Sequence, residues 1–180
     1  ELLDKIYGGW LGRCVGCLLG KPVEGWTSKM IEDYLSLGKA YPLDNYFPLP
    51  KEKIPKPLLF SSEQAKWTLG SIKGMVRDDD TDYTIMALHI FEENGFNFMP
   101  KDVGEQWLTH LPYNSVFTAE KVAYKNLVDG LLPPETATTN NPFNEWIGAQ
   151  IRADLWGYSS PGMPELAAEL AFKDAILSHV

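Results

Sequence analysis

The most constraining feature of this sequence is an acidic stretch followed at once by an apolar run, Arg77-Asp78-Asp79-Asp80-Thr81-Asp82-Tyr83-Thr84-Ile85-Met86-Ala87-Leu88. Its carboxylates repel one another unless a cation lies among them, and carboxylate and hydroxyl oxygens are the ligands that Mg²⁺ and Ca²⁺ accept. Asp and Thr also cap helices, and negative charge is favourable at a helix N-terminus. The stretch therefore predicts either a site for a hard divalent cation or a capped helix with a solvated acidic first turn.

An EF-hand loop is excluded, although Asp78, Asp80 and Asp82 have its spacing. Tyr83 stands where such a loop needs Gly, and His89 stands where it needs a bidentate Glu. We expect His89 to be a buried core histidine instead.

Composition narrows the range of partners. The chain has 180 residues, of which 44% are hydrophobic, as expected for one globular domain with a single large core. Its formal net charge of −8 argues against nucleic acid as a partner, because phosphate binding needs a basic face. No apolar run has the length of a membrane span and no signal peptide opens the sequence, so we expect no membrane partner. Because the chain opens at Glu1 without Met and stops at Val180 just after a helical pattern, we expect it to be part of a longer protein.

The two cysteines, Cys14 and Cys17, form a C-x-x-C pair. A zinc or redox role would need further soft ligands or a βαβ context, and the sequence shows neither. We therefore predict two small, buried, reduced residues in a cytoplasmic protein.

Apolar residues recur at helical spacing along most of the chain, and no segment shows the alternation of a strand. The sequence therefore predicts an all-α fold, with helices expected over residues 2–20, 28–37, 62–75, 82–93, 100–108, 115–129, 144–154 and 164–179. Residues 39–59 carry five prolines and are expected to form a long irregular connection, either a pocket rim or a surface excursion.

Gly8, Gly12, Gly16 and Gly20 recur every four residues along the first helix. Because glycine costs helix stability, this stripe predicts that another backbone crosses the first helix closely there. The helix over 82–93 is apolar nearly all round, which predicts a helix inside the fold.

Three stretches, in order, resemble the ADP-ribosylglycohydrolase family. Gly16-Cys17-Leu18-Leu19-Gly20-Lys21-Pro22-Val23-Glu24-Gly25 resembles the first motif of the family, and Thr81-Asp82-Tyr83-Thr84-Ile85-Met86 resembles its Thr-Asp-Asp-Thr-x-Met metal motif. Ile147-Gly148-Ala149-Gln150-Ile151-Arg152, followed by Asp174-Ala175-Ile176-Leu177-Ser178-His179, resembles its third region.

The resemblance implies an orthogonal all-α bundle with a two-Mg²⁺ centre, in which Mn²⁺ can replace Mg²⁺. Residues 1–180 would be the N-terminal portion of a single such domain, incomplete at its C-terminus. The implied activity is hydrolysis of the N- or O-glycosidic bond between ADP-ribose and an ADP-ribosylated protein or a small ADP-ribosyl compound. Thr81 and Asp82 would be metal ligands, and Glu24 and Asp82 catalytic carboxylates.

Three departures from the family pattern leave a second function open. Cys17 replaces an Asp of the first motif, and Tyr83 replaces the second Asp of the metal motif, so Asp80, or else Asp79, is expected to supply the missing ligand. The second metal motif of the family, Asp-x-Asp-Thr, would lie beyond Val180. The alternative is a non-catalytic, crystallin-like member of the same fold that binds an ADP-ribose-like nucleotide.

Overall fold

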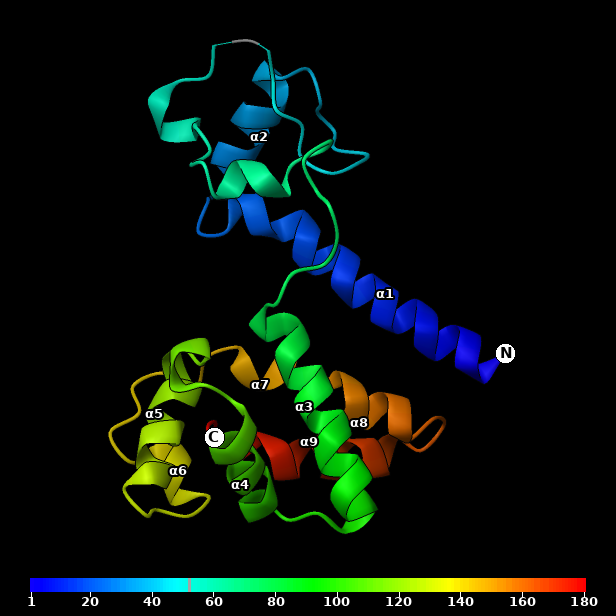
Figure 1. Ribbon diagram of the computed structural model, residues 1–180, viewed down its shortest axis with the longest axis vertical. Helices are drawn as coiled ribbons and strands as arrows, with labels where there is room; N and C mark the ends of the chain where they lie inside the picture. Colours follow the sequence, from blue (N-terminus) through cyan, green and yellow to red (C-terminus); the bar gives the residue numbers. More distant parts are fainter. Residues whose placement is uncertain (52) are drawn as a thin grey trace. The chain divides into compact units, whose positions relative to one another are not determined.

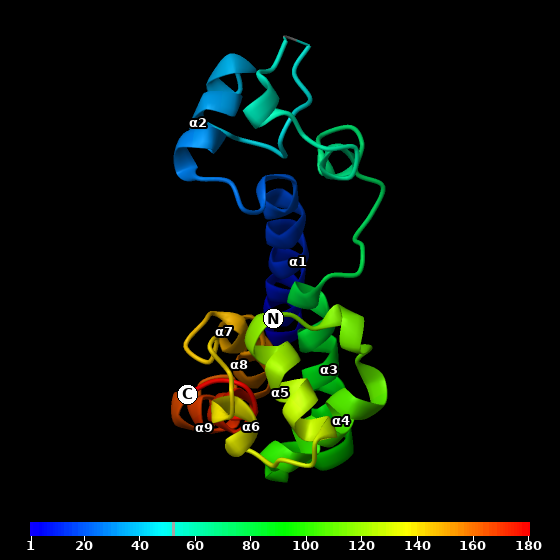
Figure 2. The same ribbon diagram turned by 90° about the vertical axis from the view of Figure 1, so that its left-hand side faces the viewer.

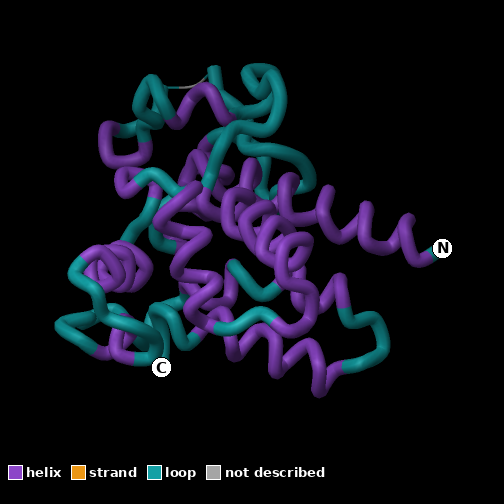
Figure 3. The backbone as a smooth tube through the Cα atoms, turned by 60° about the horizontal axis from the view of Figure 1, so that its bottom comes forward, coloured by secondary structure: helices purple, strands orange, loops and turns teal. Residues whose placement is uncertain are grey.

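The computed structural model describes residues 1–51 and 53–180. Over these residues the chain forms helices and loops and no strand (Figure 3), which confirms the all-α prediction. It divides into two compact units, Glu1–Val76 and Arg77–Val180. That both units belong to one ADP-ribosylglycohydrolase-like domain remains a prediction.

The N-terminal unit contains two α-helices and three short 3₁₀ turns (Figure 1): α1 (Leu2–Gly20), η1 (Lys21–Val23), α2 (Ser28–Leu37), η2 (Lys56–Leu58) and η3 (Gln64–Trp67). Thr27 caps α2, since its side chain accepts a hydrogen bond from the Met30 backbone N–H at 3.3 Å. Pro22 ends α1 by turning the chain into η1.

The core of this unit is an aromatic cluster around Tyr34 of α2. The rings of Trp26, Phe47 and Phe60 all lie within 6.3 Å of the Tyr34 ring, centre to centre. The Tyr34 hydroxyl donates a 2.6 Å hydrogen bond to the Pro48 carbonyl, and burial raises the pKa of Tyr34 to about 12. In the proline-rich segment 39–59, the described residues 39–51 and 53–59 form the irregular connection that was expected, and Phe47, Ile54 and Leu58 pack into the core.

The predicted close crossing on α1 is wrong. Gly8, Gly12, Gly16 and Gly20 are exposed, and a methyl group at any of these positions would find no atom within 4 Å. Among α1 residues only Leu18 is buried, because the helix joins the core of its unit through its last turn alone.

The C-terminal unit is a bundle in which α3 packs against α4 and α8, α4 against α5 and α9, and α5 against α6 (Figures 1 and 2). Its elements are α3 (Asp79–Asn94), η4 (Gly95–Asn97), α4 (Pro100–His110), η5 (Tyr113–Ser115), α5 (Thr118–Val128), α6 (Glu135–Thr138), α7 (Gly148–Ile151), α8 (Asp154–Ser159) and α9 (Pro164–Ala175). Its core centres on Trp107 and Trp156, both nearly free of solvent exposure.

The expectation that α3 lies inside the fold is only partly right. Met86, Ala87 and Ile90 are buried, but Ile85 and Leu88 on the other face are exposed. His89 is half-exposed and is therefore not the core histidine that the sequence suggested. Because its neighbours in the bundle cover one side of α3, the other side stays open despite its apolar residues.

Two other helix predictions fail for local reasons. Residues 62–75 form only the short turn η3, since Gly70 and Gly74 both adopt positive φ. Residues 144–154 do not form one helix either: α7 ends at Ile151, and α8 begins at Asp154.

Two glycines of the N-terminal unit give a matched test of the backbone. At both Gly12 and Gly25 a methyl group would meet no atom within 4 Å, but Gly25 has a φ of 77° whereas Gly12 is helical. Gly12→Ala should therefore stabilise the unit by about 0.5–1 kcal/mol, and Gly25→Ala should destabilise it by about 1–2 kcal/mol. Urea unfolding of both variants measures the difference, and a loss of stability in Gly12→Ala would restore the close helix crossing.

Candidate metal centre

The acidic stretch forms the first turn of α3, and Asp78 is its N-cap. The Asp78 carboxylate accepts a 3.1 Å hydrogen bond from the Asp80 backbone N–H, while the Asp78 carbonyl accepts from the backbone N–H groups of Thr81 and Asp82. The polar groups of this turn therefore satisfy the free N–H groups of the helix start, as the capping prediction requires.

This turn gathers four carboxylates within five positions. Partial burial, together with a hydrogen bond to Asp78 and the charges of Asp78 and Asp80, raises the pKa of Asp79 to about 7. The side-chain donors in this turn are oxygens of the kind that Mg²⁺ prefers, so the turn offers ligands that a divalent cation could bind.

Thr81 and Asp82 face different surroundings. Thr81 is buried, and its hydroxyl donates a 3.0 Å hydrogen bond to the Asp78 carbonyl, which leaves its oxygen lone pairs available. The Asp82 carboxylate accepts a 2.7 Å hydrogen bond from Arg77 Nε. The Asp82 carboxylate is thus paired with the guanidinium of Arg77, a residue of the same stretch.

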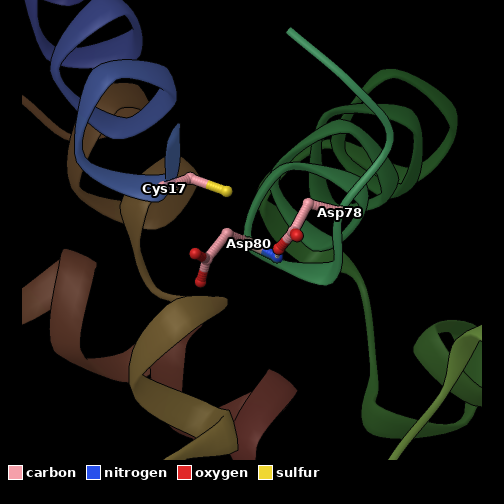
Figure 4. A group of neighbouring side chains, drawn as sticks. All are labelled: Cys17, Asp78 and Asp80. Atoms are coloured by element: carbon pink, nitrogen blue, oxygen red, sulfur yellow. Dashed lines mark hydrogen bonds between the residues drawn. The ribbon is translucent and has the colours of Figure 1, made fainter. Parts of the chain in front are cut away.

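Among the predicted ligands, the structure brings Asp80 together with Asp78 rather than with Asp82. Oxygens of Asp78 and Asp80 lie within 4.8 Å of each other at the start of α3 (Figure 4). Consecutive helical residues point about 100° apart, so Asp80, Thr81 and Asp82 project in different directions. Asp78 is the candidate that sequence reasoning left out of the ligand set, although it belongs to the same run of carboxylates.

Tyr83, which stands where the family motif has a second Asp, belongs to the core of the C-terminal unit. Its ring lies 5.4 Å from the Trp107 ring, centre to centre, and its hydroxyl is buried without a hydrogen-bond partner. Burial, with the charge of Glu120 adding to it, raises the pKa of the Tyr83 phenol well above its usual value. Its phenol is therefore not available as an anionic ligand.

Glu24 lies in the N-terminal unit, on a turn with a firmly held backbone. Pro22 and Val23 before it are buried, and the Gln64 side chain donates a 2.9 Å hydrogen bond to the Pro22 carbonyl. The Trp26 N–H closes the turn onto the Val23 carbonyl at 2.9 Å. The Glu24 side chain itself is exposed, so this turn presents a carboxylate to solvent from a fixed point.

Cys17 lies on α1 of the same unit. Neither it nor Cys14 forms a disulfide, as expected, but both are only half-buried. The prediction of two buried cysteines is therefore wrong, because α1 exposes most of its surface.

The third region of sequence resemblance forms a buried ionic cluster around Arg152, which is 1% exposed. Arg152 Nε donates to the Asp174 carboxylate at 2.7 Å, and Nη1 donates to the Glu120 carboxylate at 3.0 Å and to the Ser178 hydroxyl at 2.7 Å. Nη2 donates to the Asp174 carbonyl at 2.9 Å. Burial raises the pKa of the Glu120 and Asp174 carboxyls, and the Arg152 charge opposes that rise.

Gly148 makes room for this cluster. A methyl group there would lie 1.8 Å from Glu120 Oε1, which is far inside van der Waals contact. The Glu120 carboxylate can therefore approach the backbone of α7 at Gly148. Arg152 lies four residues later, at the end of the same helix, and its guanidinium reaches the same carboxylate. Sequence reasoning missed Glu120, since no local pattern separates it from a surface Glu.

His179 closes the region beside the cluster. Its Nδ1 lies 2.8 Å from the Ser178 hydroxyl, and burial, assisted by the charge of Arg152, lowers the pKa of His179 to about 4. His179 is therefore neutral at pH 7.

The sequence matches the profile of the ADP-ribosylglycohydrolase family over residues 1–180. The chain therefore belongs to the ADP-ribosylglycohydrolase family, whose members are hydrolases that act on ADP-ribosylated substrates and generally depend on a metal. Comparison with curated proteins and with solved structures gives no match. Among the described helices, none combines the length and apolar character needed to cross a membrane.

Gly148 and Gly157 give a matched test of the space around Glu120. Gly148→Ala should destabilise the C-terminal unit by about 1–3 kcal/mol or more, the usual cost of overpacking. Gly157→Ala should leave stability unchanged or raise it, because a methyl group there meets no atom within 4 Å. Urea denaturation midpoints of the two variants decide this, and equal midpoints would mean that Glu120 moves away at no cost.

Removing the Arg152 charge should destabilise the C-terminal unit more than Gly148→Ala does. Arg152→Met leaves two buried carboxylates without a partner and should cost about 3–5 kcal/mol of unfolding free energy. Adding Glu120→Gln and Asp174→Asn to this variant should recover part of that loss, because no uncompensated charge then remains. A triple variant no more stable than Arg152→Met would show that packing, rather than charge, fixes Arg152.

Proposed function

We propose that this chain carries part of a Mg²⁺-dependent site that hydrolyses an ADP-ribosyl bond, N- or O-glycosidic, in an ADP-ribosylated protein or a small ADP-ribosyl compound. The family match over residues 1–180 carries this proposal, and the carboxylates gathered at the start of α3 support its metal dependence. In the reaction, a water oxygen bonds to the ribose anomeric carbon, the glycosidic bond breaks, and the leaving group takes up a proton.

Asp80, Thr81 and Asp82 would hold the metal, with Asp78 beside them. When bound, the ion would polarise ribose hydroxyls and lower the pKa of a coordinated water. For Asp82 to serve as a ligand, its carboxylate must turn partly away from Arg77, or coordinate through the oxygen that Arg77 does not use.

Glu24 and Asp82 would supply the carboxylates of the reaction. The departing glycosidic bond develops positive charge on the ribose ring, and nearby carboxylates stabilise that charge. Glu24 suits this role because its backbone is held on both sides while its side chain is free to meet a substrate. A fixed carboxylate loses little freedom when it orients a water or a ribose hydroxyl.

A non-catalytic member of the same fold, binding an ADP-ribose-like nucleotide, is the second candidate. It is favoured by the burial of Tyr83 in the position of the second Asp, and by the pairing of Asp82 with Arg77. The two candidates differ in turnover and not in fold, so kinetics separates them.

Magnesium binding tests the metal ligands. In calorimetric titrations of the full-length protein, Asp82→Asn should weaken Mg²⁺ binding at least about tenfold, as loss of a ligand costs no less than loss of a group that orients one. Asp44→Asn makes the same change of charge on an exposed loop of the other unit and should bind as the unsubstituted protein does. Arg77→Gln should keep or raise the affinity, since it releases the Asp82 carboxylate. Equal heats for Asp82→Asn and the unsubstituted protein would remove Asp82 from the site.

Glu24→Gln tests catalysis. If Glu24 acts in the transition state, kcat for release of ADP-ribose should fall by about 10²–10⁴-fold, with little change in folding or in Mg²⁺ affinity. The assay uses full-length protein, saturating Mg²⁺ and a panel of ADP-ribosylated arginine, serine and polymer substrates, with Glu32→Gln on the exposed face of α2 as the matched control. Unchanged turnover by Glu24→Gln would make this carboxylate a structural residue, and absence of turnover from the unsubstituted protein would favour the binding-only candidate.

A further inference from the structure

Two histidines from neighbouring helices meet at a cavity of the C-terminal unit. His89 lies on the open face of α3, and His110 is the last residue of α4. Their Nε2 atoms are 3.2 Å apart, and their rings meet at 89°. The cavity has a volume of about 460 Å³, and its polar lining also includes Arg77, Asp82 and Glu92. The function proposed above assigns no role to either histidine.

Both histidines are held by buried neighbours. Ile90 follows His89 directly and is 1% exposed, while Leu111 follows His110 and is 5% exposed. The packing of α3 on α4 therefore fixes the two backbone positions from which the imidazoles project. Such preorganisation is what a metal site needs from its scaffold.

The distance between the nitrogens fits two ligands of one tetrahedral ion. With Zn–N bonds of 2.0–2.1 Å, two imidazole nitrogens on a tetrahedral zinc lie about 3.3 Å apart, close to the 3.2 Å observed here. The same 3.2 Å separation also suits a hydrogen bond between the two rings, whose centres are 4.7 Å apart. A cation between the two nitrogens would replace that hydrogen bond and be bound by both imidazoles.

The surroundings favour a cation as well. Glu92 is three residues after His89, hence on the same side of α3, and its exposed side chain can rotate to supply a third ligand. His110 stands at the C-terminus of α4, where the helix dipole is negative. Arg77, the cation that lines the same cavity, is already paired with Asp82 at 2.7 Å.

We propose that His89 and His110, with Glu92 as third ligand, form a site for a borderline divalent transition-metal ion, Zn²⁺ first and Ni²⁺ or Co²⁺ next, that links α3 to α4. Imidazole selects these ions, whereas Mg²⁺ keeps to oxygen ligands, so the site is separate in chemistry from the acidic start of α3. The remaining positions on the ion would hold water from the cavity. Because the ion bridges two helices of the folded state, its binding stabilises the C-terminal unit.

Zn²⁺ binding to the full chain tests this site, in saturating Mg²⁺ so that oxygen sites are filled, and with Cys14→Ser and Cys17→Ser so that thiols do not contribute. His89→Ala and His110→Gln should each weaken Zn²⁺ binding at least about tenfold. Thr109→Ala, next to His110 and exposed, should bind Zn²⁺ as the parent does. Glu92→Gln should weaken binding, whereas Glu93→Gln should not, because Glu92 alone of the two lines the cavity.

Two further measurements test the site without relying on the Zn²⁺ affinity. Nitrogen NMR of the imidazoles should show Zn²⁺ shifting the Nε2 signals of His89 and His110 while leaving the buried His179 unchanged. Zn²⁺ should raise the melting temperature of the parent and not that of His110→Gln, a change at an exposed residue that leaves the core intact. Unshifted Nε2 signals, or Zn²⁺ affinity unchanged in both histidine variants, would overturn the proposal and leave a simple imidazole–imidazole hydrogen bond.

Discussion

The C-terminal unit depends on the compensation of one buried charge. Arg152 joins carboxylates from α5 and α9, stacks over the Trp107 ring at 4.9 Å, and reaches the hydroxyl of Ser178 near the end of the chain. A buried guanidinium needs acceptors for its N–H groups, and here each guanidinium nitrogen donates at least one hydrogen bond. A single side chain thus connects helices that are far apart in sequence.

The two groups of carboxylates in this unit lie in different environments. Glu120 and Asp174 are buried against a guanidinium, which makes them part of the core. Asp78, Asp79 and Asp80 crowd the first turn of α3, where burial and, after it, the neighbouring carboxylates raise the pKa of Asp79 to about 7. The first group lies inside the core beside its cation, and the second offers oxygen ligands at a helix start.

Much of the fold could be predicted from local patterns. Thr27 and Asp78 cap helices because their side chains accept from nearby backbone N–H groups, and Pro22 and Pro100 stand where α1 ends and α4 begins, as their missing N–H predicts. The close helix crossing predicted from the glycine stripe on α1 was wrong. Four-residue spacing shows that the glycines share one face of the helix, but it does not show whether another helix covers that face. The long helix expected over 144–154 failed because helical spacing does not reveal a break at Arg152–Ala153.

The sequence by itself determined the all-α class, the acidic helix start and the membership of the ADP-ribosylglycohydrolase family, because these rest on periodicity, capping chemistry and ordered motifs within one chain. Only the tertiary structure decided that Arg152 meets Glu120, that Tyr83 packs against Trp107 in the core, and that His89 meets His110 at a cavity. In the sequence, Arg152 is 32 residues from Glu120, Tyr83 is 24 residues from Trp107, and His89 is 21 residues from His110. Their contacts depend on which helix faces pack together, a choice set by the sum of burial over the whole unit rather than by any local pattern.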